Sequence, residues 1–347
     1  MANLLSYDMR LFTSRMVDAK KLSALLKACP DSVHRDPKFS ESKIQNLKSK
    51  IGSPGIEPEL IADYACETGE GPLWHPIEQR LYWLDIPAGR LFRYDPVSDV
   101  HELCFEGEPV GGITLQADGS LLFFMARGAV RCWRDGALTT MLDEIPEERN
   151  TRFNDVIADP LGGVFCGTMP TDDRPGHLYR MATDGSVRLI EGDLGVSNGM
   201  GFTPDRKGMY HTDSTRCTIY RYDFDPVTGD VSDRRVFDQV AEGEGSPDGL
   251  TVDAEGCVWS ARWDGSCVVR YAPDGTQLMR IPIPTPKVSS LTFGGSDYTD
   301  IYVTTAGGEN REANGPEAGA LYRVNVGILG VAEFPSRIGL LPNRRQL

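Results

Sequence analysis

The sequence of 347 residues contains no long apolar segment and no excess of positive charge. A transmembrane helix needs about 20 consecutive apolar residues, and no run in the sequence approaches that length. The net charge of −14 at pH 7 is repelled by nucleic-acid phosphates and by anionic lipid surfaces. We therefore expect neither a nucleic acid nor a membrane as a partner, whereas the surplus of carboxylates is compatible with cation binding.

Closely spaced cysteine pairs are also missing, because the eight cysteines include no Cys-x-x-Cys motif. Four of them, Cys132, Cys166, Cys257 and Cys267, lie in apolar strand-like segments, where a thiol behaves as a small hydrophobic group. We expect reduced thiols in a cytoplasmic protein rather than a disulfide framework. The first eight residues lack the basic and long apolar regions of a secretory signal.

Residues 1–56 differ from the rest of the chain, with ten Lys or Arg against five Asp or Glu. Helices are predicted over about 15–29 and from Ser40 to the stop signal at Gly52 and Pro54. We predict a helical or partly disordered N-terminal extension over 1–56, followed by one domain over 57–347. A packing appendage, an organelle-import segment and a disordered tail all stay open as roles for the extension.

From about residue 59 the sequence repeats itself, and six segments align on an aliphatic run. The first residues of these segments, here called the markers, are Glu70, Gly111, Asn154, Asn198, Asp248 and Ser289. Successive markers are 41, 43, 44, 50 and 41 residues apart. A repeat of this length is typical of a β-propeller blade.

Two further patterns support six blades. Each repeat contains an apolar residue followed by Arg, and Asp-Gly pairs separate the β-rich runs, as hairpin turns require. The run 59–62 precedes the first repeat and has no strands of its own to join. We therefore predict an all-β fold, a six-bladed propeller in which this N-terminal strand completes the sixth blade and leaves few free edges.

Residues at one repeat position of a propeller lie on one ring about its axis, so we expect the markers to precede the innermost strands and to face the tunnel entrance. Taken singly, Asn-Gly and Asp-Gly are ordinary turn pairs. Taken together, Glu70, Asn198 and Asp248 would be costly to bury without a cation. Oxygen ligands alone favour Ca²⁺, Mg²⁺ or Mn²⁺, and the lack of His at any marker argues against a His-rich zinc site.

Five motifs in order resemble the gluconolactonase / regucalcin (senescence marker protein) / luciferin-regenerating family over about 59–324. The first is Gly69-Glu70-Gly71-Pro72-Leu73-Trp74 with Leu81-Tyr82-Trp83-Leu84-Asp85-Ile86. The others are Arg152-Phe153-Asn154-Asp155, Gly167-Thr168-Met169, Ser197-Asn198-Gly199 and Pro247-Asp248-Gly249. Residues 1–56 match nothing in the family pattern.

The resemblance implies that Glu70, Asn198 and Asp248 hold one divalent cation. Ca²⁺ is the expected ion, with Mg²⁺, Mn²⁺, Zn²⁺ and Fe²⁺ as alternatives. It also implies that Arg152 and Asn154 contact the substrate, with Asn154 near the metal. The loop after Met169 is shorter than in some animal members, which have a substrate-binding Glu there. Asp172 or Asp173 could replace that residue.

The activity implied is hydrolysis of a sugar lactone, such as a glucono- or pentonolactone, to the aldonic acid. The metal would be the Lewis acid, and Asp248 the general base. A phosphotriesterase or other esterase, a non-catalytic calcium-binding regulator and an interaction scaffold are the alternatives, and a monomer and a homodimer are equally compatible with the sequence. We expect His75 and His211 to be structural and Asp213-Ser214 to border the pocket.

Overall fold

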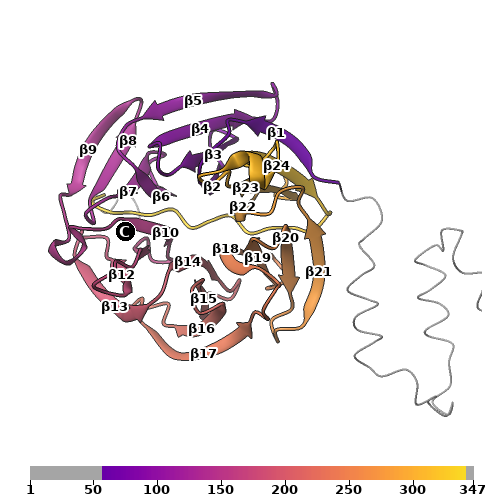
Figure 1. Ribbon diagram of the computed structural model, residues 1–347. Coiled ribbons are helices and arrows are strands. Elements are labelled where there is room, and N and C mark those ends of the chain that lie inside the picture. Colours follow the sequence, from indigo (N-terminus) through magenta and orange to yellow (C-terminus); the bar gives the residue numbers. More distant parts are fainter. Residues whose placement is uncertain (1–56, 341–347) are drawn as a thin grey trace, which may run out of the picture. The chain divides into compact units, whose positions relative to one another are not determined.

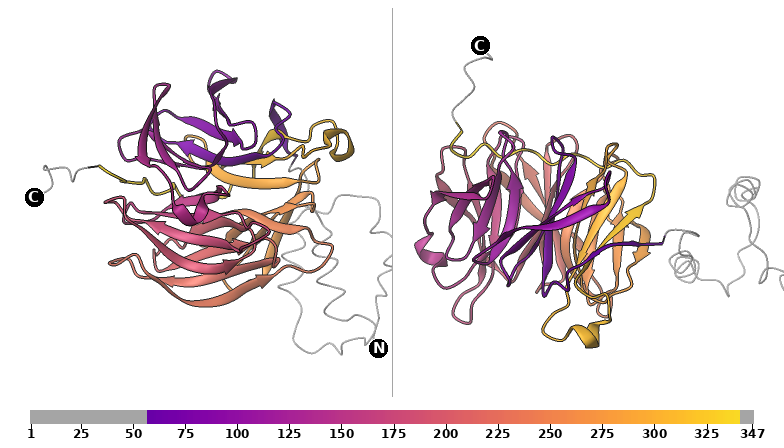
Figure 2. Two further views of the ribbon diagram at one scale, coloured as in Figure 1. Left: turned by 60° about the vertical axis from the view of Figure 1, so that its left-hand side comes forward. Right: turned by 90° about the horizontal axis from the view of Figure 1, so that it is seen from above.

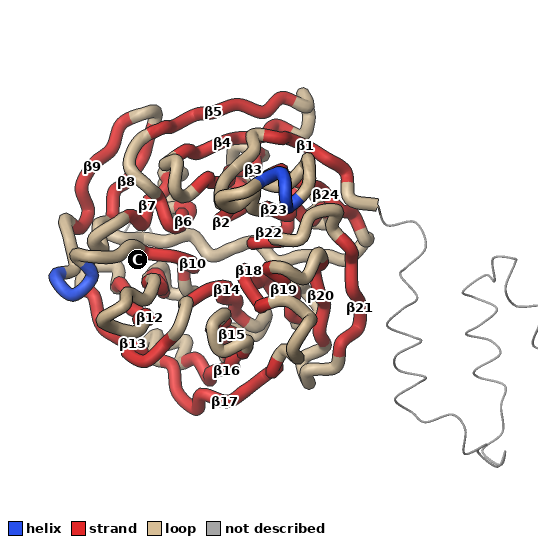
Figure 3. Tube along the Cα trace, viewed as in Figure 1, coloured by secondary structure: helices blue, strands red, loops and turns tan. Residues whose placement is uncertain are grey.

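The computed structural model describes residues 57–340, so the helices predicted within 1–56 lie outside the described residues. The described part consists of six four-stranded antiparallel sheets, which surround a central axis (Figure 1). This arrangement confirms the predicted six-bladed propeller. Within these residues, helix is limited to the turn η2 (Pro146–Glu148) and the short α3 (Arg311–Asn314), drawn blue in Figure 3. Neither is long or apolar enough to cross a membrane.

Each blade is a meander that runs outward from the axis, and its strands follow one another in the chain. Blade 1 comprises β2 (Gly69–His75), β3 (Arg80–Asp85), β4 (Arg90–Asp95) and β5 (Val100–Glu106). Blade 2 comprises β6 (Val110–Leu115), β7 (Leu121–Met125), β8 (Val130–Arg134) and β9 (Ala137–Leu142). Blade 3 comprises β10 (Phe153–Ala158), β11 (Val164–Thr168), β12 (Gly176–Met181) and β13 (Val187–Leu194). Blade 4 comprises β14 (Ser197–Phe202), β15 (Gly208–Asp213), β16 (Thr218–Phe224) and β17 (Val231–Gln239). Blade 5 comprises β18 (Ser246–Val252), β19 (Val258–Trp263), β20 (Cys267–Tyr271) and β21 (Gln277–Pro282).

Blade 6 is assembled from both ends of the described chain. Its inner strands are β22 (Val288–Gly294), β23 (Asp300–Thr305) and β24 (Ala320–Asn325), and its outermost strand is β1 (Glu59–Asp63). β1 pairs antiparallel with β24, from Glu59 opposite Arg323 to Asp63 opposite Ala320. The predicted closure by the N-terminal strand is therefore confirmed.

The apolar cores lie between neighbouring blades. Six buried clusters are present, and each joins residues of two adjacent blades around the ring. Four tryptophans belong to these clusters: Trp74, Trp83, Trp133 and Trp259. None of the cysteines within 57–340 forms a disulfide. Because every interface needs both of its blades, closure of the ring is what completes the sixth core.

A segment that the sequence did not predict crosses one face of the ring. Residues 326–340, here called the C-terminal strap, leave β24 and run over the axis in yellow (Figures 1 and 2). The main chain of the strap is hydrogen-bonded to four blades. Gly330 N–H donates to Tyr298 O in blade 6, and Leu329 O accepts from Ala254 N–H in blade 5. Ser336 N–H donates to Leu115 O in blade 2, and Arg337 N–H donates to Gly162 O in blade 3. Phe334 and Ile338 of the strap pack into the cores between blades. The strap therefore fastens blades that do not touch one another.

The innermost strands share an irregularity at the marker positions. In all six blades the pairing of the innermost strand with its neighbour shifts register at or just after the marker. A β-bulge of this kind changes the direction in which the side chains of the strand point. The markers lie inside the innermost strands, so the expectation that they precede those strands was wrong. The bulge explains how strand residues nevertheless face the axis.

The glycines that follow the markers are required by space at the axis. A Cβ on Gly199 would overlap the main-chain nitrogen of Leu250 and the oxygen of Asp248, and one on Gly249 would overlap Ser290. The Asn-Gly and Asp-Gly pairs of the markers are thus close-approach points between blades and not turns. The other Asp-Gly pairs, such as those at Gly119 and Gly185, do lie in hairpin turns.

We predict that Gly199→Ala lowers the free energy of unfolding by about 1–3 kcal/mol, because the added methyl group overpacks the axis. Gly192→Ala is the matched control, since a Cβ there meets only Leu189 Cδ2 at 3.6 Å and His177 Cδ2 at 4.0 Å. Urea unfolding of both variants measures the difference. Equal free energies of unfolding for the two variants would contradict the steric crowding at Gly199.

Candidate active site

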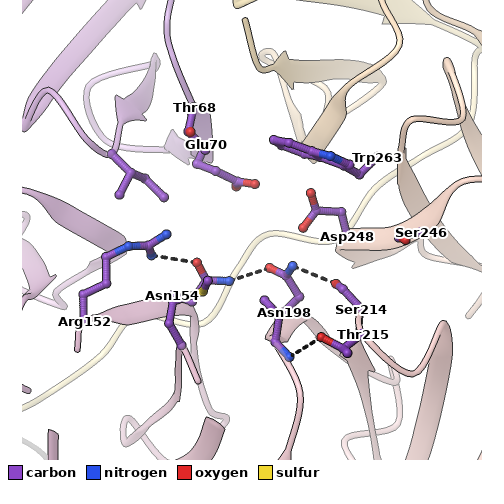
Figure 4. A pocket seen from close by; sticks show the side chains of 13 residues that line it. Thr68, Glu70, Arg152, Asn154, Asn198, Ser214, Thr215, Ser246, Asp248 and Trp263 are labelled. Carbon is purple, nitrogen blue, oxygen red and sulfur yellow. Dashed lines mark hydrogen bonds between the residues drawn. The ribbon is translucent and has the colours of Figure 1, made fainter. Parts of the chain in front are cut away.

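A cavity of about 360 Å³ opens at the end of the tunnel where the innermost strands begin, opposite the face that the strap crosses. Such a volume is at the small end of ligand pockets, which span about 300–1,000 Å³, and it suits a ligand of monosaccharide size. Its wall combines apolar and polar side chains: Thr68, Glu70, Ile86, Arg152, Asn154, Met169, Val196, Asn198, Ser214, Thr215, Ser246, Asp248 and Trp263. Figure 4 shows these residues pointing into the cavity from several blades.

The structure brings five predicted site residues together around this cavity: Glu70, Arg152, Asn154, Asn198 and Asp248. All but Arg152, which immediately precedes β10, are markers held in the bulges of four innermost strands. The other two markers contribute no side-chain donor or acceptor to the wall, because Gly111 has no side chain and the hydroxyl of Ser289 donates to Gly69 O. The markers of four blades only therefore contribute polar side chains to the cavity wall.

One hydrogen-bond chain orients the two amides. Arg152 Nη1 donates to Asn154 Oδ1 at 2.8 Å, and Asn154 Nδ2 donates to Asn198 Oδ1 at 2.8 Å. Asn198 Nδ2 then donates to Ser214 Oγ at 2.8 Å, and this hydroxyl donates to Pro247 O at 2.6 Å. Because a main-chain oxygen ends the chain, every donor and acceptor upstream of it has a defined direction. Asn198 Oδ1 keeps a second lone pair for a ligand.

The two carboxylates of the site are buried and poorly compensated. Asp248 makes no hydrogen bond or ion pair within 57–340, and Glu70 accepts only from the N–H of Gly71, at 2.9 Å. Burial raises the pKa of both carboxyl groups, and the charge of Asp155 raises each of them further. Burial also raises the pKa of Asp155 to about 7 and lowers that of Arg152. The site is therefore short of positive charge.

This donor set fits a hard divalent cation. Two buried carboxylates without a cationic partner, beside a carboxamide oxygen with a free lone pair, are oxygen ligands of the kind that Ca²⁺ or Mg²⁺ prefers. No group of three or more His, Cys, Asp or Glu within 57–340 is arranged to hold a metal. An ion here would depend on the amide of Asn198 as well as on Glu70 and Asp248.

Asp172 and Asp173 are exposed on the loop between β11 and β12 and are not part of the cavity wall. The following residue, Arg174, points inward and pairs with the buried Glu148, whose carboxylate also accepts from Tyr179 Oη at 2.7 Å. This network holds the end of the loop. Contact of Asp172 or Asp173 with a substrate stays a prediction.

Several wall residues were missed by sequence reasoning. Thr68, Met169 and Trp263 stand at strand ends, where nothing in a repeat of apolar runs distinguishes a pocket residue from a packing one. Ser214 was expected at the pocket border and does line it, whereas Asp213 is fully buried beneath and accepts from Gly195 N–H. His211 is buried away from the cavity and bonds to Ser197 Oγ at 2.8 Å.

Comparisons with known proteins identify the family of the chain. The family model described as "SMP-30/Gluconolactonase/LRE-like region" matches residues 68–307. The chain belongs to this family. It is 50% identical over 287 residues to a pentonolactonase of Haloferax volcanii, covering 81% of this chain and 98% of that one. It is 37% identical over 273 residues to a 6-deoxy-6-sulfogluconolactonase of Pseudomonas putida, covering 76% and 93%.

A solved luciferin-regenerating enzyme superposes on the propeller with a TM-score of 0.75 and 29% identity, over 82% of this chain and 100% of that one. The resemblance drawn from the five motifs is thereby confirmed at the level of the family. The family match ends at residue 307, so it includes every residue of the cavity wall and leaves the C-terminal strap outside.

Proposed function

We propose that this protein hydrolyses a neutral aldonolactone, with pentonolactones as the first candidates, using a divalent cation held by Glu70, Asn198 and Asp248. The observation that carries the proposal is the pair of buried, unpaired carboxylates on the wall of a sugar-sized cavity. The pentonolactonase that shares half of its residues with this chain over nearly its own full length supports the choice of substrate.

When bound, the cation would supply Lewis-acid polarisation of the lactone carbonyl. Asp248 would accept a proton from the attacking water as the new C–O bond forms. The ring C–O bond then breaks, and the same proton passes to the departing alkoxide, which gives the open hydroxy acid. Arg152, of which only Nη1 is bonded within the protein, would donate N–H groups to the hydroxyl groups of the sugar, and Asn154 Oδ1 would accept from one of them, since both N–H groups of Asn154 are used by Ser197 O and Asn198 Oδ1.

We predict that Asp248→Asn lowers lactone turnover by about 10²–10⁴-fold, the usual contribution of general-base assistance, while some cation binding is retained. Turnover is measured with a pH indicator on chelated protein resupplied with Ca²⁺, Mg²⁺, Mn²⁺, Zn²⁺ or Fe²⁺. The control is Asp233→Asn, because Asp233 is exposed on β17. Hydrolysis by Asp248→Asn at the parent rate would rule out the role of Asp248.

The charge of the cavity predicts its selectivity. Arg152 is the one Lys, Arg or His side chain among the described wall residues, and it is already bonded to Asn154 and to Phe153 O. With the proposed cation balancing Glu70 and Asp248, Arg152 is the one cationic side chain left in the wall, and a 6-sulfonate or 6-phosphate would compete for it with the hydroxyl groups of the sugar. Among the described wall residues there is therefore no second cationic side chain that could bind a sulfonate or phosphate apart from the sugar itself.

We therefore expect kcat/KM for gluconolactones bearing a 6-sulfonate or 6-phosphate to be at least about tenfold below that for neutral aldonolactones, a difference of about 1.4 kcal/mol. A panel of both classes at fixed ionic strength measures the ratio. Equal values for charged and neutral lactones would contradict this selectivity without affecting the role of Asp248.

A further inference from the structure

Trp263 is the one aromatic side chain among the described residues of the cavity wall. The other four tryptophans of the sequence lie in the buried clusters between blades, whereas Trp263 belongs to none of the six clusters and is partly exposed. An indole offers a large apolar surface together with one N–H donor. The packing of the blades therefore does not explain why such a side chain stands at the cavity.

The pairing of β18 with β19 brings Trp263 close to the acids of the site. Trp263 is the last residue of β19 and lies opposite Ser246, which is two residues before Asp248. Figure 4 shows the indole on the same side of the cavity as Asp248 and Arg152 on the other side. A ligand between them would have an aromatic ring on one side and a hydrogen-bonding guanidinium on the other.

The neighbours of Trp263 hold its indole in one orientation. Lys287 Nζ lies 4.7 Å from the centroid of the indole ring and donates to Asp264 Oδ1 at 2.7 Å. A cation over an aromatic ring is attracted by the negative charge of the ring face. Lys287 is not part of the wall, so the side of the ring that it covers is not the side that meets the cavity. The preceding residue, Arg262, is fully buried and donates to Ser260 Oγ at 2.7 Å, which fixes the strand at this point.

The edge of the indole carries a donor that the other wall residues do not use. Nε1 of Trp263 makes no hydrogen bond with any of them (Figure 4). The side chain thus presents an apolar face for C–H groups and an N–H group for a hydroxyl oxygen. A sugar ring carries both kinds of group in fixed positions. An open-chain polyol has to lose rotational freedom before it can present the same surface.

We propose that Trp263 is the specificity-determining residue of the site, and that its indole packs against the C–H groups of the lactone ring and favours ring-closed sugars over open-chain ones. This inference rests on the proposed lactone hydrolysis and extends it. The hydroxyl groups of the ring are directed towards Arg152 and Asn154. Hydrolysis opens the ring, so the product gives up the flat contact with the indole. Trp263 therefore holds the lactone more tightly than the acid that is released.

The test uses two neutral probes that contain no carbonyl group to hydrolyse. A 1,4-anhydropentitol keeps a five-membered sugar ring, and the corresponding pentitol is its open-chain counterpart. Calorimetry is carried out on full-length protein loaded with Ca²⁺. We expect the dissociation constant of the cyclic probe to be about fivefold below that of the pentitol, a ratio in the range of one aromatic contact. Trp263→Ala should lose this preference, and an unchanged ratio would overturn the proposal.

Tryptophan fluorescence locates the contact within the molecule. The cyclic probe should change the emission of the parent saturably, and Trp263→Phe should abolish the change while an aromatic face and most of the affinity remain. The matched control is Trp133→Phe, at a tryptophan of the core between blades 1 and 2, which should keep the response. A response that persists in Trp263→Phe, or one that is lost in Trp133→Phe alone, would count against the contact.

Kinetics separate a role in specificity from a structural one. For a pentonolactone, Trp263→Ala should raise KM at least about tenfold and change kcat less than about threefold, as expected when a binding contact is lost. Trp263→Phe should recover most of the KM. A fall in kcat and in melting temperature without recovery by Phe would indicate a structural role and overturn the proposal. If the parent binds both probes as expected but hydrolyses no lactone, the proposed function fails and the sugar-ring contact stands.

Discussion

The close approach of six innermost strands around one axis is the constraint on which the site depends. The apolar cores lie between blades. The axis is therefore lined by backbone atoms and by the small or polar side chains that the bulges direct inward. At the level just below the markers, four glycines and one serine leave almost no room for side chains, and Gly199 and Gly249 nearly touch the main chain of the next blade. Side chains longer than these must point to one end of the tunnel, which is why the markers gather at its mouth.

The sequence was sufficient to predict the architecture and to bring three of the markers to one end of the tunnel. A repeat of fixed length forces equivalent positions onto one ring, so Glu70, Asn198 and Asp248 could be placed together although they are far apart in the chain. The isolated run 59–62 similarly predicted how the ring closes. In each case the inference rested on symmetry, which a sequence shows directly, and not on the local conformation of any one residue.

The features that were missed have no such signature. The bulge leaves no trace in the apolar pattern, because it changes where a residue points and not what it is. The strap belongs to no repeat, and its partner Gln116, whose Nε2 donates to Ile338 O, lies 222 residues away in the sequence. Asp172 and Asp173 lie outside the cavity wall because the path of their loop is set by Glu148 and Arg174, which a motif does not include, and their contact with a substrate stays a prediction.

The same rigidity explains how the fold can keep acids on its axis. Two like charges in a flexible loop would move apart, whereas Glu70 and Asp248 are held in strands that the six blade interfaces lock in place. Their repulsion can then be relieved only by protons or by a cation, and the hydrogen-bond chain from Arg152 to Pro247 O already aims an amide oxygen at the same space. A site preorganised in this way loses little entropy when a ligand arrives. The proposed cation affinity would therefore be a consequence of ring closure, and a change that loosens one blade interface should weaken ion binding at the axis before it unfolds the ring.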